Sequence, residues 1–128
     1  MKDILSLTDI KLLVDTFYGK VREDELLANI FNGVIKNKWP QHLEKMYRFW
    51  QTILLGEHTY YGSPFAPHAD LPIDAKHFER WIELFYSTID ELFEGEKAVE
   101  AKWRAQKMAE MFLLKIKCYK ERDSKPLL

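Results

Sequence analysis

His68 is the residue of this chain whose setting most clearly suggests chemistry. Its imidazole lies between Pro67 and Pro72, and amphipathic helical patterns lie on both sides of the segment 60–72. Because proline fixes φ and breaks helices, this segment should form a loop with at most one short helical turn. Such a loop presents a single side chain at a defined angle. An imidazole presented in this way is a good axial ligand for iron.

Other metal chemistry has less support. The histidines are His42, His58, His68 and His77. No two of them are four residues apart, and no Cys-x-x-Cys occurs, so the three or four placed ligands of a zinc site are not predicted. The absence of Cys-x-x-Cys-His excludes covalent attachment of haem.

Nucleophilic and phosphate chemistry also lack their motifs, since the chain has no glycine-rich phosphate loop and no nucleophile elbow. Cys118, the single cysteine, adjoins Tyr119 on the last predicted helix. It is interpreted as a packing residue rather than a nucleophile. One cysteine cannot form an intrachain disulfide, which fits a reducing compartment.

His42 lies on a helical pattern with an unusually wide apolar arc. A row of residues one turn apart is offset from the stripe through Leu43 and Trp50, and it consists of His42, Met46, Phe49 and Ile53. A helix buried on two sides would explain this arc. The alternative is a helix that faces both protein and something flat and apolar.

Tyr18 and Trp81 lie on the inward stripes of two other helical patterns. A buried tyrosine hydroxyl or tryptophan N–H needs a hydrogen-bond partner. Each residue alone is readily explained as a core residue. With His42, the two side chains would be able to converge on one small cavity.

Helical periodicity positions all of these residues, and no strand alternation occurs. Four long helices are predicted, with boundaries set by capping residues, proline and glycine. The first begins near Ser6, with Asp9 as capping-box partner, and ends before Arg22–Glu25. The second extends from Trp39-Pro40 to Gly56, the third from after Asp74 to Gly95, and the last from near Lys97 to near Tyr119. A short apolar patch at 26–31 is followed by a predicted turn at Asn32-Gly33, and the tail 121–128 is expected to fray.

Bulk composition predicts one all-α domain over residues 1–128. The content of 47% hydrophobic residues is ample for a core, and 19 basic against 20 acidic residues give a formal charge of −1. This balance offers no electrostatic footprint for nucleic acid or an anionic membrane. No signal-peptide shape and no apolar run of about 20 residues is present, so a soluble cytoplasmic protein is expected.

The order of several short motifs resembles that of the group III truncated haemoglobins, a bacterial family. The resemblance extends from about Ile10 to Tyr119. It is carried by Phe17-Tyr18-x-Lys20-Val21-Arg22, Ile30-Phe31-Asn32, Trp39-x-x-His42, Phe49-Trp50, Leu54-Leu55-Gly56-Glu57, Tyr60-x-Gly62-x-Pro64, His68-x-Asp70-Leu71-Pro72 and Trp81. The family's fold is a two-over-two helical sandwich around haem, in which the proximal helix is reduced to a turn.

The resemblance implies specific roles for residues of this chain. His68 corresponds to the proximal iron ligand, with its second ring nitrogen bonded to a carbonyl or acidic group. Tyr18, His42 and Trp81 correspond to the distal side, where Tyr18 and Trp81 donate to a diatomic ligand and His42 gates access or binds it. Lys45 is placed to reach a haem propionate. The apolar wall is assigned to Phe31, Met46, Phe49, Ile53 and Leu71.

The implied function is a haem b protein that binds O₂ and other small ligands, CO, NO and cyanide among them, at ferrous iron. An enzyme that uses the bound ligand, as an NO dioxygenase or a peroxidase-like protein, is the alternative. It would need an external electron donor, because no reductase domain is visible. A haem-free helical interaction module is a third reading, which leaves the setting of His68 unexplained. Fold alone does not choose among them.

Overall fold

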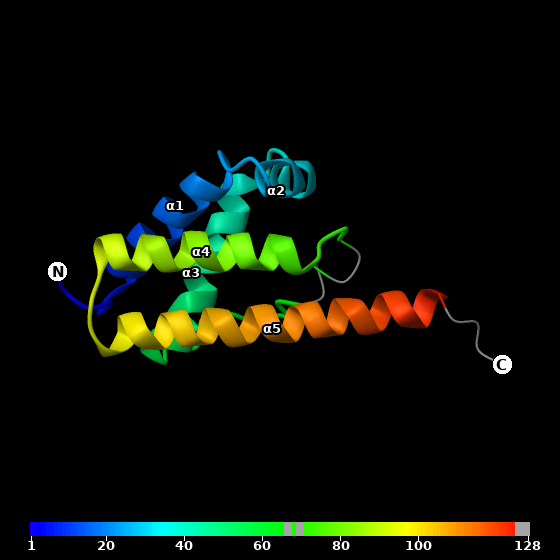
Figure 1. Cartoon of the computed structure of the whole chain (residues 1–128). Coiled ribbons are helices and arrows are strands. Elements are labelled where there is room, and N and C mark those ends of the chain that lie inside the picture. Colours follow the sequence, from blue (N-terminus) through cyan, green and yellow to red (C-terminus); the bar gives the residue numbers. More distant parts are fainter. Residues whose placement is uncertain (66–67, 69–70, 125–128) are drawn as a thin grey trace.

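The computed structural model describes residues 1–65, 68 and 71–124, and within them the secondary structure is entirely helical (Figure 1). The helices are α1 (Leu7–Val21), α2 (Ala28–Ile35), α3 (Trp39–Leu55), α4 (Ala75–Leu92) and α5 (Glu96–Ser124). The predicted all-α class is therefore confirmed.

Local capping explains where most helices begin and end. The Ser6 hydroxyl accepts a hydrogen bond from the Asp9 N–H at 3.3 Å, and the Asp9 carboxylate accepts one from the Ser6 N–H at 3.2 Å. Asp74 caps α4 through the Lys76 N–H at 3.2 Å. Gly56 ends α3 with φ of 69°, the left-handed conformation that a helix C-terminus favours and that glycine adopts without strain.

Two boundary predictions are wrong. Asn32 and Gly33 lie inside α2 rather than in a turn, and the Asn32 side chain accepts a hydrogen bond from the Trp39 indole at 3.2 Å. This tertiary contact outweighs the weak helix propensity of the pair. Residues 121–124 continue α5 instead of fraying, because the sequence has no helix breaker before Pro126. The rest of that tail lies outside the described residues.

The helices form two packed pairs. α4 and α5 run antiparallel side by side, α1 packs on α3, and α1 also packs on α4 (Figure 1). Aromatic side chains fill the junction: the Phe85 ring stacks on Trp50 at 5.1 Å between centroids and meets Phe17 edge-on at 5.1 Å. This arrangement is the predicted two-over-two sandwich.

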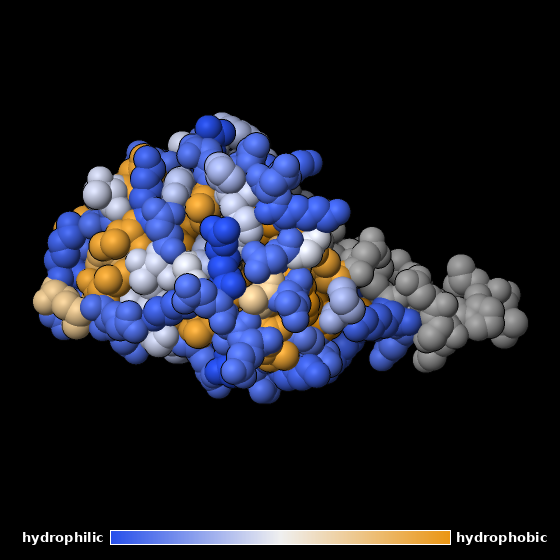
Figure 2. Space-filling model, turned by 90° about the horizontal axis from the view of Figure 1, so that it is seen from above, coloured by the Kyte–Doolittle hydropathy of each residue, from blue (hydrophilic) through white to orange (hydrophobic). Residues whose placement is uncertain are grey.

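The outer surface carries mainly hydrophilic side chains. Figure 2, which looks down on the side of α1 and α2, shows them covering most of that face, with hydrophobic residues reaching the surface in separate places. None of the helices among the described residues has the length and apolarity needed to cross a membrane.

Candidate cofactor site

A cavity of about 620 Å³ lies between the two helix pairs, within the size range of small-molecule and cofactor pockets. All five helices and the segment between α3 and α4 contribute to its wall. The residues of this wall include Tyr18, Phe31, His42, Lys45, Met46, Phe49, Tyr60, Pro64, His68, Leu71, Trp81 and Phe112.

His68 stands on one side of this cavity in a short 3₁₀ turn. Its backbone N–H donates to the Phe65 carbonyl at 2.7 Å, and its ring Nδ1 lies 2.7 Å from the Pro64 carbonyl. Because a carbonyl only accepts, Nδ1 carries the proton and Nε2 keeps its lone pair. The expected carbonyl partner is confirmed, whereas residues 66–67 and 69–70 of the expected turn lie outside the described residues. His68 thus offers an unprotonated nitrogen suited to a metal.

The ring of His68 is further fixed by packing and kept neutral by burial. Phe112 of α5 lies 5.0 Å from it between ring centroids. Burial lowers the pKa of His68 below its ordinary value, while the hydrogen bond with Pro64 acts in the opposite direction. The neutral imidazole is the form that binds a metal.

Tyr18 of α1 presents a phenol to the same cavity. The residue is buried, and its hydroxyl has no hydrogen-bond partner among the described residues. Burial raises the pKa of Tyr18 well above its usual value, so the hydroxyl keeps its proton. A buried phenol without a protein partner is a donor available to something inside the cavity.

His42 of α3 lies beside Tyr18, with 5.0 Å between the two ring centroids. Its other side meets the Trp39 ring at 5.6 Å. Nε2 of His42 is completely buried and lacks a hydrogen-bond partner within the described part of the chain. Burial, with smaller effects from His68 and Lys45, lowers the pKa of His42 from 6.5 to about 4. An orphaned polar nitrogen in this position indicates that the cavity is built for a ligand.

Trp81 of α4 completes the polar group. Its ring stacks on Phe85 with 5.5 Å between centroids and an interplanar angle of 8°, and it meets Phe17 edge-on at 5.5 Å. These contacts hold the indole at the cavity wall. The structure therefore brings Tyr18, His42 and Trp81 to one cavity with His68.

Of the remaining predicted pocket residues, five line the cavity: Phe31, Lys45, Met46, Phe49 and Leu71. Ile53 differs, since it packs against the hydrophobic core and is not part of the cavity wall. After α3 the chain folds back along this helix. Residues 59–64 therefore form the part of the wall that was expected from Ile53. Tyr60 meets the Phe49 ring at 5.3 Å there.

Sequence reasoning missed much of the remaining wall. Met108, Ala109 and Phe112 come from the inward stripe of α5, and Phe78 comes from α4. The helical spacing of all four is that of inward-facing residues, yet such spacing could not separate a face against protein from a face against a cavity. Tyr60 carried no such signal because it lies in irregular structure.

The residues present fit a haem. A largely apolar cavity suits the flat macrocycle, and one imidazole with a free nitrogen suits the iron. The orphaned His42 nitrogen and the unpartnered Tyr18 hydroxyl suit a polar ligand on the other face. A cluster of three or more His, Cys, Asp or Glu side chains able to hold a bare metal ion does not occur among the described residues.

Known proteins show the same combination of sequence and fold. The profile of the bacterial-like globin family matches residues 4–114. The chain is 37% identical over 107 residues to the group 3 truncated hemoglobin ctb of Campylobacter jejuni, covering 80% of this chain and 84% of that protein. The crystal structure of group III truncated hemoglobin from Campylobacter jejuni superposes with a TM-score of 0.82 at 35% identity, covering 91% of this chain and 95% of the other. The chain belongs to the bacterial-like globin family and is a haem-binding globin of the group III truncated haemoglobins.

Proposed function

We propose that this globin binds haem b through His68 and holds O₂ or another diatomic ligand on the opposite side of the cavity. The observation that carries the proposal is the His68 ring, whose Nδ1 is engaged by Pro64 at 2.7 Å while the ring borders the cavity shared with Tyr18, His42 and Trp81. Bound haem supplies a ferrous iron that coordinates diatomic ligands reversibly. The absence of Cys-x-x-Cys-His favours the non-covalent b type.

The chain's own contribution on the distal side is electrostatic. Tyr18 and Trp81 each bring one N–H or O–H donor to a cavity whose lining is largely apolar. Donors already held in a region of low dielectric stabilise negative charge strongly, because they need not reorient when it develops. They therefore restrain a ligand that takes on partial negative charge, as O₂ does.

The cavity wall has two further tasks. Phe31, Met46 and Phe49 present apolar surface that keeps water from the site and so slows oxidation of the iron. Lys45 is exposed at the cavity edge, where its ammonium group is suited to a propionate of the haem.

The proposed ligand site has a direct test in haem titration. Wild-type apoprotein should take up one equivalent of haemin and develop a Soret band. His68→Ala should bind haemin far more weakly, and added imidazole should restore part of the binding. His58→Ala provides the matched control, because His58 is exposed and outside the cavity wall. Full haem retention with an unchanged spectrum in His68→Ala would reject His68 as the ligand.

An enzymatic role is the second candidate, and the three polar side chains on the distal side favour it. Tight retention of O₂ suits chemistry on the ligand better than bulk delivery. The oxygenated protein mixed with NO in a stopped-flow instrument should then yield ferric protein and nitrate rapidly. Turnover would continue only with an external reductant. Slow reaction with NO, or failure of every cellular reductant to reduce the ferric protein, would reject the dioxygenase role. Ligand binding, sensing or peroxide chemistry would then remain as functions.

A further inference from the structure

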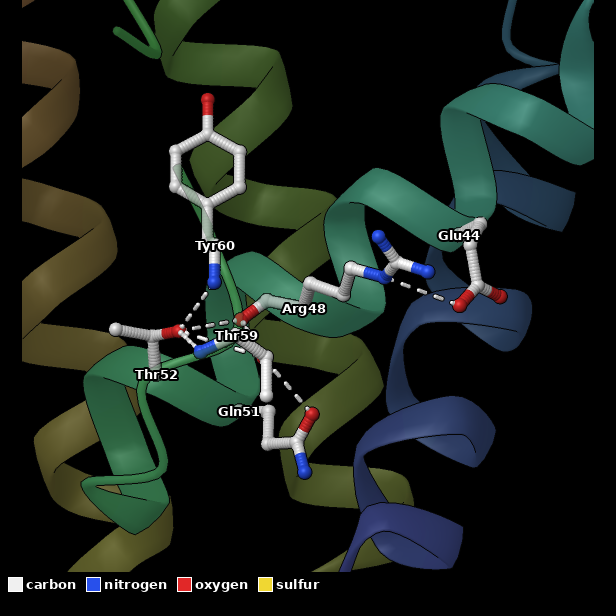
Figure 3. Close-up of polar contacts among 6 residues, drawn as sticks. All are labelled: Glu44, Arg48, Gln51, Thr52, Thr59 and Tyr60. Carbon is white, nitrogen blue, oxygen red and sulfur yellow. Dashed lines mark hydrogen bonds and ion pairs between the residues drawn. The ribbon is translucent and has the colours of Figure 1, made fainter. Parts of the chain in front are cut away.

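The segment that leads to His68 is tied to α3 by one hydroxyl group. Thr52, near the end of α3, accepts hydrogen bonds from the backbone N–H groups of Thr59 at 3.1 Å and Tyr60 at 3.0 Å (Figure 3). The same hydroxyl donates to the Arg48 carbonyl at 2.8 Å. A threonine hydroxyl has one proton and two lone pairs, so its whole hydrogen-bonding capacity is used.

A second hydroxyl, from the segment itself, reinforces this attachment. The Thr59 hydroxyl lies 3.0 Å from the Gln51 amide oxygen and 3.2 Å from the Arg48 carbonyl, and its single proton can be donated to either acceptor (Figure 3). Two consecutive residues of the irregular segment are thereby held against the last turns of α3. Irregular backbone is otherwise the part of a protein that opens most easily.

The attachment point is close in sequence to the groups that orient His68. Directly after it, Tyr60 packs on Phe49 and forms cavity wall. Four residues further on, the Pro64 carbonyl accepts from His68 Nδ1. Where Pro64 lies therefore depends on where the segment leaves α3.

We propose that Thr52 is a positioning residue for the proximal ligand: its hydroxyl fixes the start of the segment and, through Pro64, the orientation of the His68 ring. The inference rests on the proposed function, because it takes His68 as the iron ligand. Thr52 itself is not part of the cavity wall. Its effect on the iron is transmitted through backbone alone.

Threonine hydroxyls also bond back to their own helix without any role in a site, and α4 offers such a case. Thr88 donates to the Leu84 carbonyl at 2.6 Å, the same i−4 pattern as Thr52 and Arg48, and it has no hydrogen bond to a loop among the described residues. Thr88→Val removes the intrahelical bond alone. Thr52→Val removes that bond and both bonds to the segment, so the difference between the variants isolates the attachment.

The test compares Thr52→Val, Thr52→Ser and Thr88→Val. In apoprotein, NMR-detected hydrogen exchange at the Thr59 and Tyr60 amides should become about tenfold faster in Thr52→Val, the scale of one lost hydrogen bond. In ferrous haem protein, the iron–histidine stretching band in resonance Raman spectra should broaden or shift, and haem should dissociate several-fold faster. Thr52→Ser should restore wild-type behaviour in all three measurements. Thr88→Val should leave the amide exchange, the band and the haem dissociation rate unchanged.

An unchanged iron–histidine band in Thr52→Val, or a change of equal size in Thr88→Val, would overturn the inference. If Thr52→Val does not fold, Thr59→Ala removes the second hydroxyl alone and should show the same effects at smaller size; no effect would again contradict the proposal. Failure of the proposed function itself is recognised separately, since His68→Ala would then keep the iron–histidine band. In that case the amide exchange would still report the attachment, and the positioning role would be rejected.

Discussion

At the scale of single residues, the distal side depends on two donors that serve one acceptor. Tyr18→Phe or Trp81→Phe should raise the O₂ dissociation rate by about tenfold to a hundredfold, since a hydrogen bond to a charged acceptor contributes roughly 1.5–3 kcal/mol. The double variant should show less than the product of the two effects, because the donors share the ligand. Stopped-flow O₂ release measures this. Tyr86→Phe is the control, since the Tyr86 hydroxyl bonds the Lys102 carbonyl instead. Additive effects below twofold would make both residues ordinary core residues.

His42 should control ligand access without acting as a pH switch near neutrality. Removal of its ring in His42→Ala should speed CO binding, because the imidazole lies against Tyr18 in the cavity wall. Burial lowers the pKa of His42 from 6.5 to about 4, so it stays neutral well below its ordinary titration range and becomes charged only as the pH falls toward 4. CO association in wild type should therefore be flat between about pH 5 and pH 8. A step centred near pH 6.5 that disappears in His42→Ala would contradict this.

These residues also show the reach and the limit of sequence reasoning. His68, Tyr18, His42 and Trp81 were predicted because residue type, proline context and motif order all bear on them. Tyr60 and Thr52 were not, because their importance arises from a chain that folds back on α3, and no periodic pattern records such a contact. Ile53 was misplaced for the same reason.

At the scale of helices, capping by near neighbours was predictable and capping by distant residues was not. Ser6 and Asp74 cap helices that begin directly after them. The N-terminus of α5 is instead capped by Asp3, whose carboxylate accepts from the N–H groups of Lys97 and Ala98, both at 2.9 Å. No residue near position 96 in the sequence predicts this cap.

The Asp3 cap gives a stability prediction. Asp3→Ala should lower the free energy of unfolding by about 1–2 kcal/mol, since it leaves helix N–H groups without partners. Asp90→Ala is the control, because Asp90 is an exposed residue paired with Lys102 across the surface. Chemical denaturation of the two variants measures the difference. Equal effects would mean that the cap contributes no more than a surface ion pair.

The same cap has a defined pH dependence. Burial raises the pKa of Asp3, but the hydrogen bonds from Lys97, Ile4 and Ala98 and the charge of Lys97 outweigh this effect. The pKa of Asp3 therefore lies below its ordinary value of 3.8. The folded protein therefore holds this carboxylate ionised more strongly than the unfolded chain does. Its stabilisation should be fully present above about pH 5 and be lost as the pH falls through the folded pKa. A stability difference between wild type and Asp3→Ala that grows on acidification would contradict this sign.

At the scale of the whole molecule, the cavity lies beside the junction of the two helix pairs and draws its wall from all five helices. A core interrupted by about 620 Å³ of cavity leaves the apoprotein with fewer packing contacts than a filled core would give. The all-α class and the sandwich followed from periodicity and motif order. The depth of the cavity depends on how the pairs sit together, which the sequence pattern does not specify.

Haem should therefore stabilise the molecule as a unit. Loading at a thousandfold excess over its Kd should add about 4 kcal/mol to the free energy of unfolding. Thermal denaturation should show one cooperative transition that moves to higher temperature, and hydrogen exchange should slow in helices of both pairs. His68→Ala should lose most of the gain at equal haemin concentration. Protection confined to α3 would indicate a surface site instead.

The resonance Raman spectrum of the ferrous, ligand-free protein tests most directly whether His68 binds the iron. Wild type should show an iron–histidine stretching band. His68→Gly should lose this band, and added imidazole should restore an iron–imidazole band that shifts when the imidazole is labelled with ¹⁵N. His42→Gly should leave the band in place. Retention of the band in His68→Gly together with its loss in His42→Gly would place the iron on the opposite ligand and contradict the account.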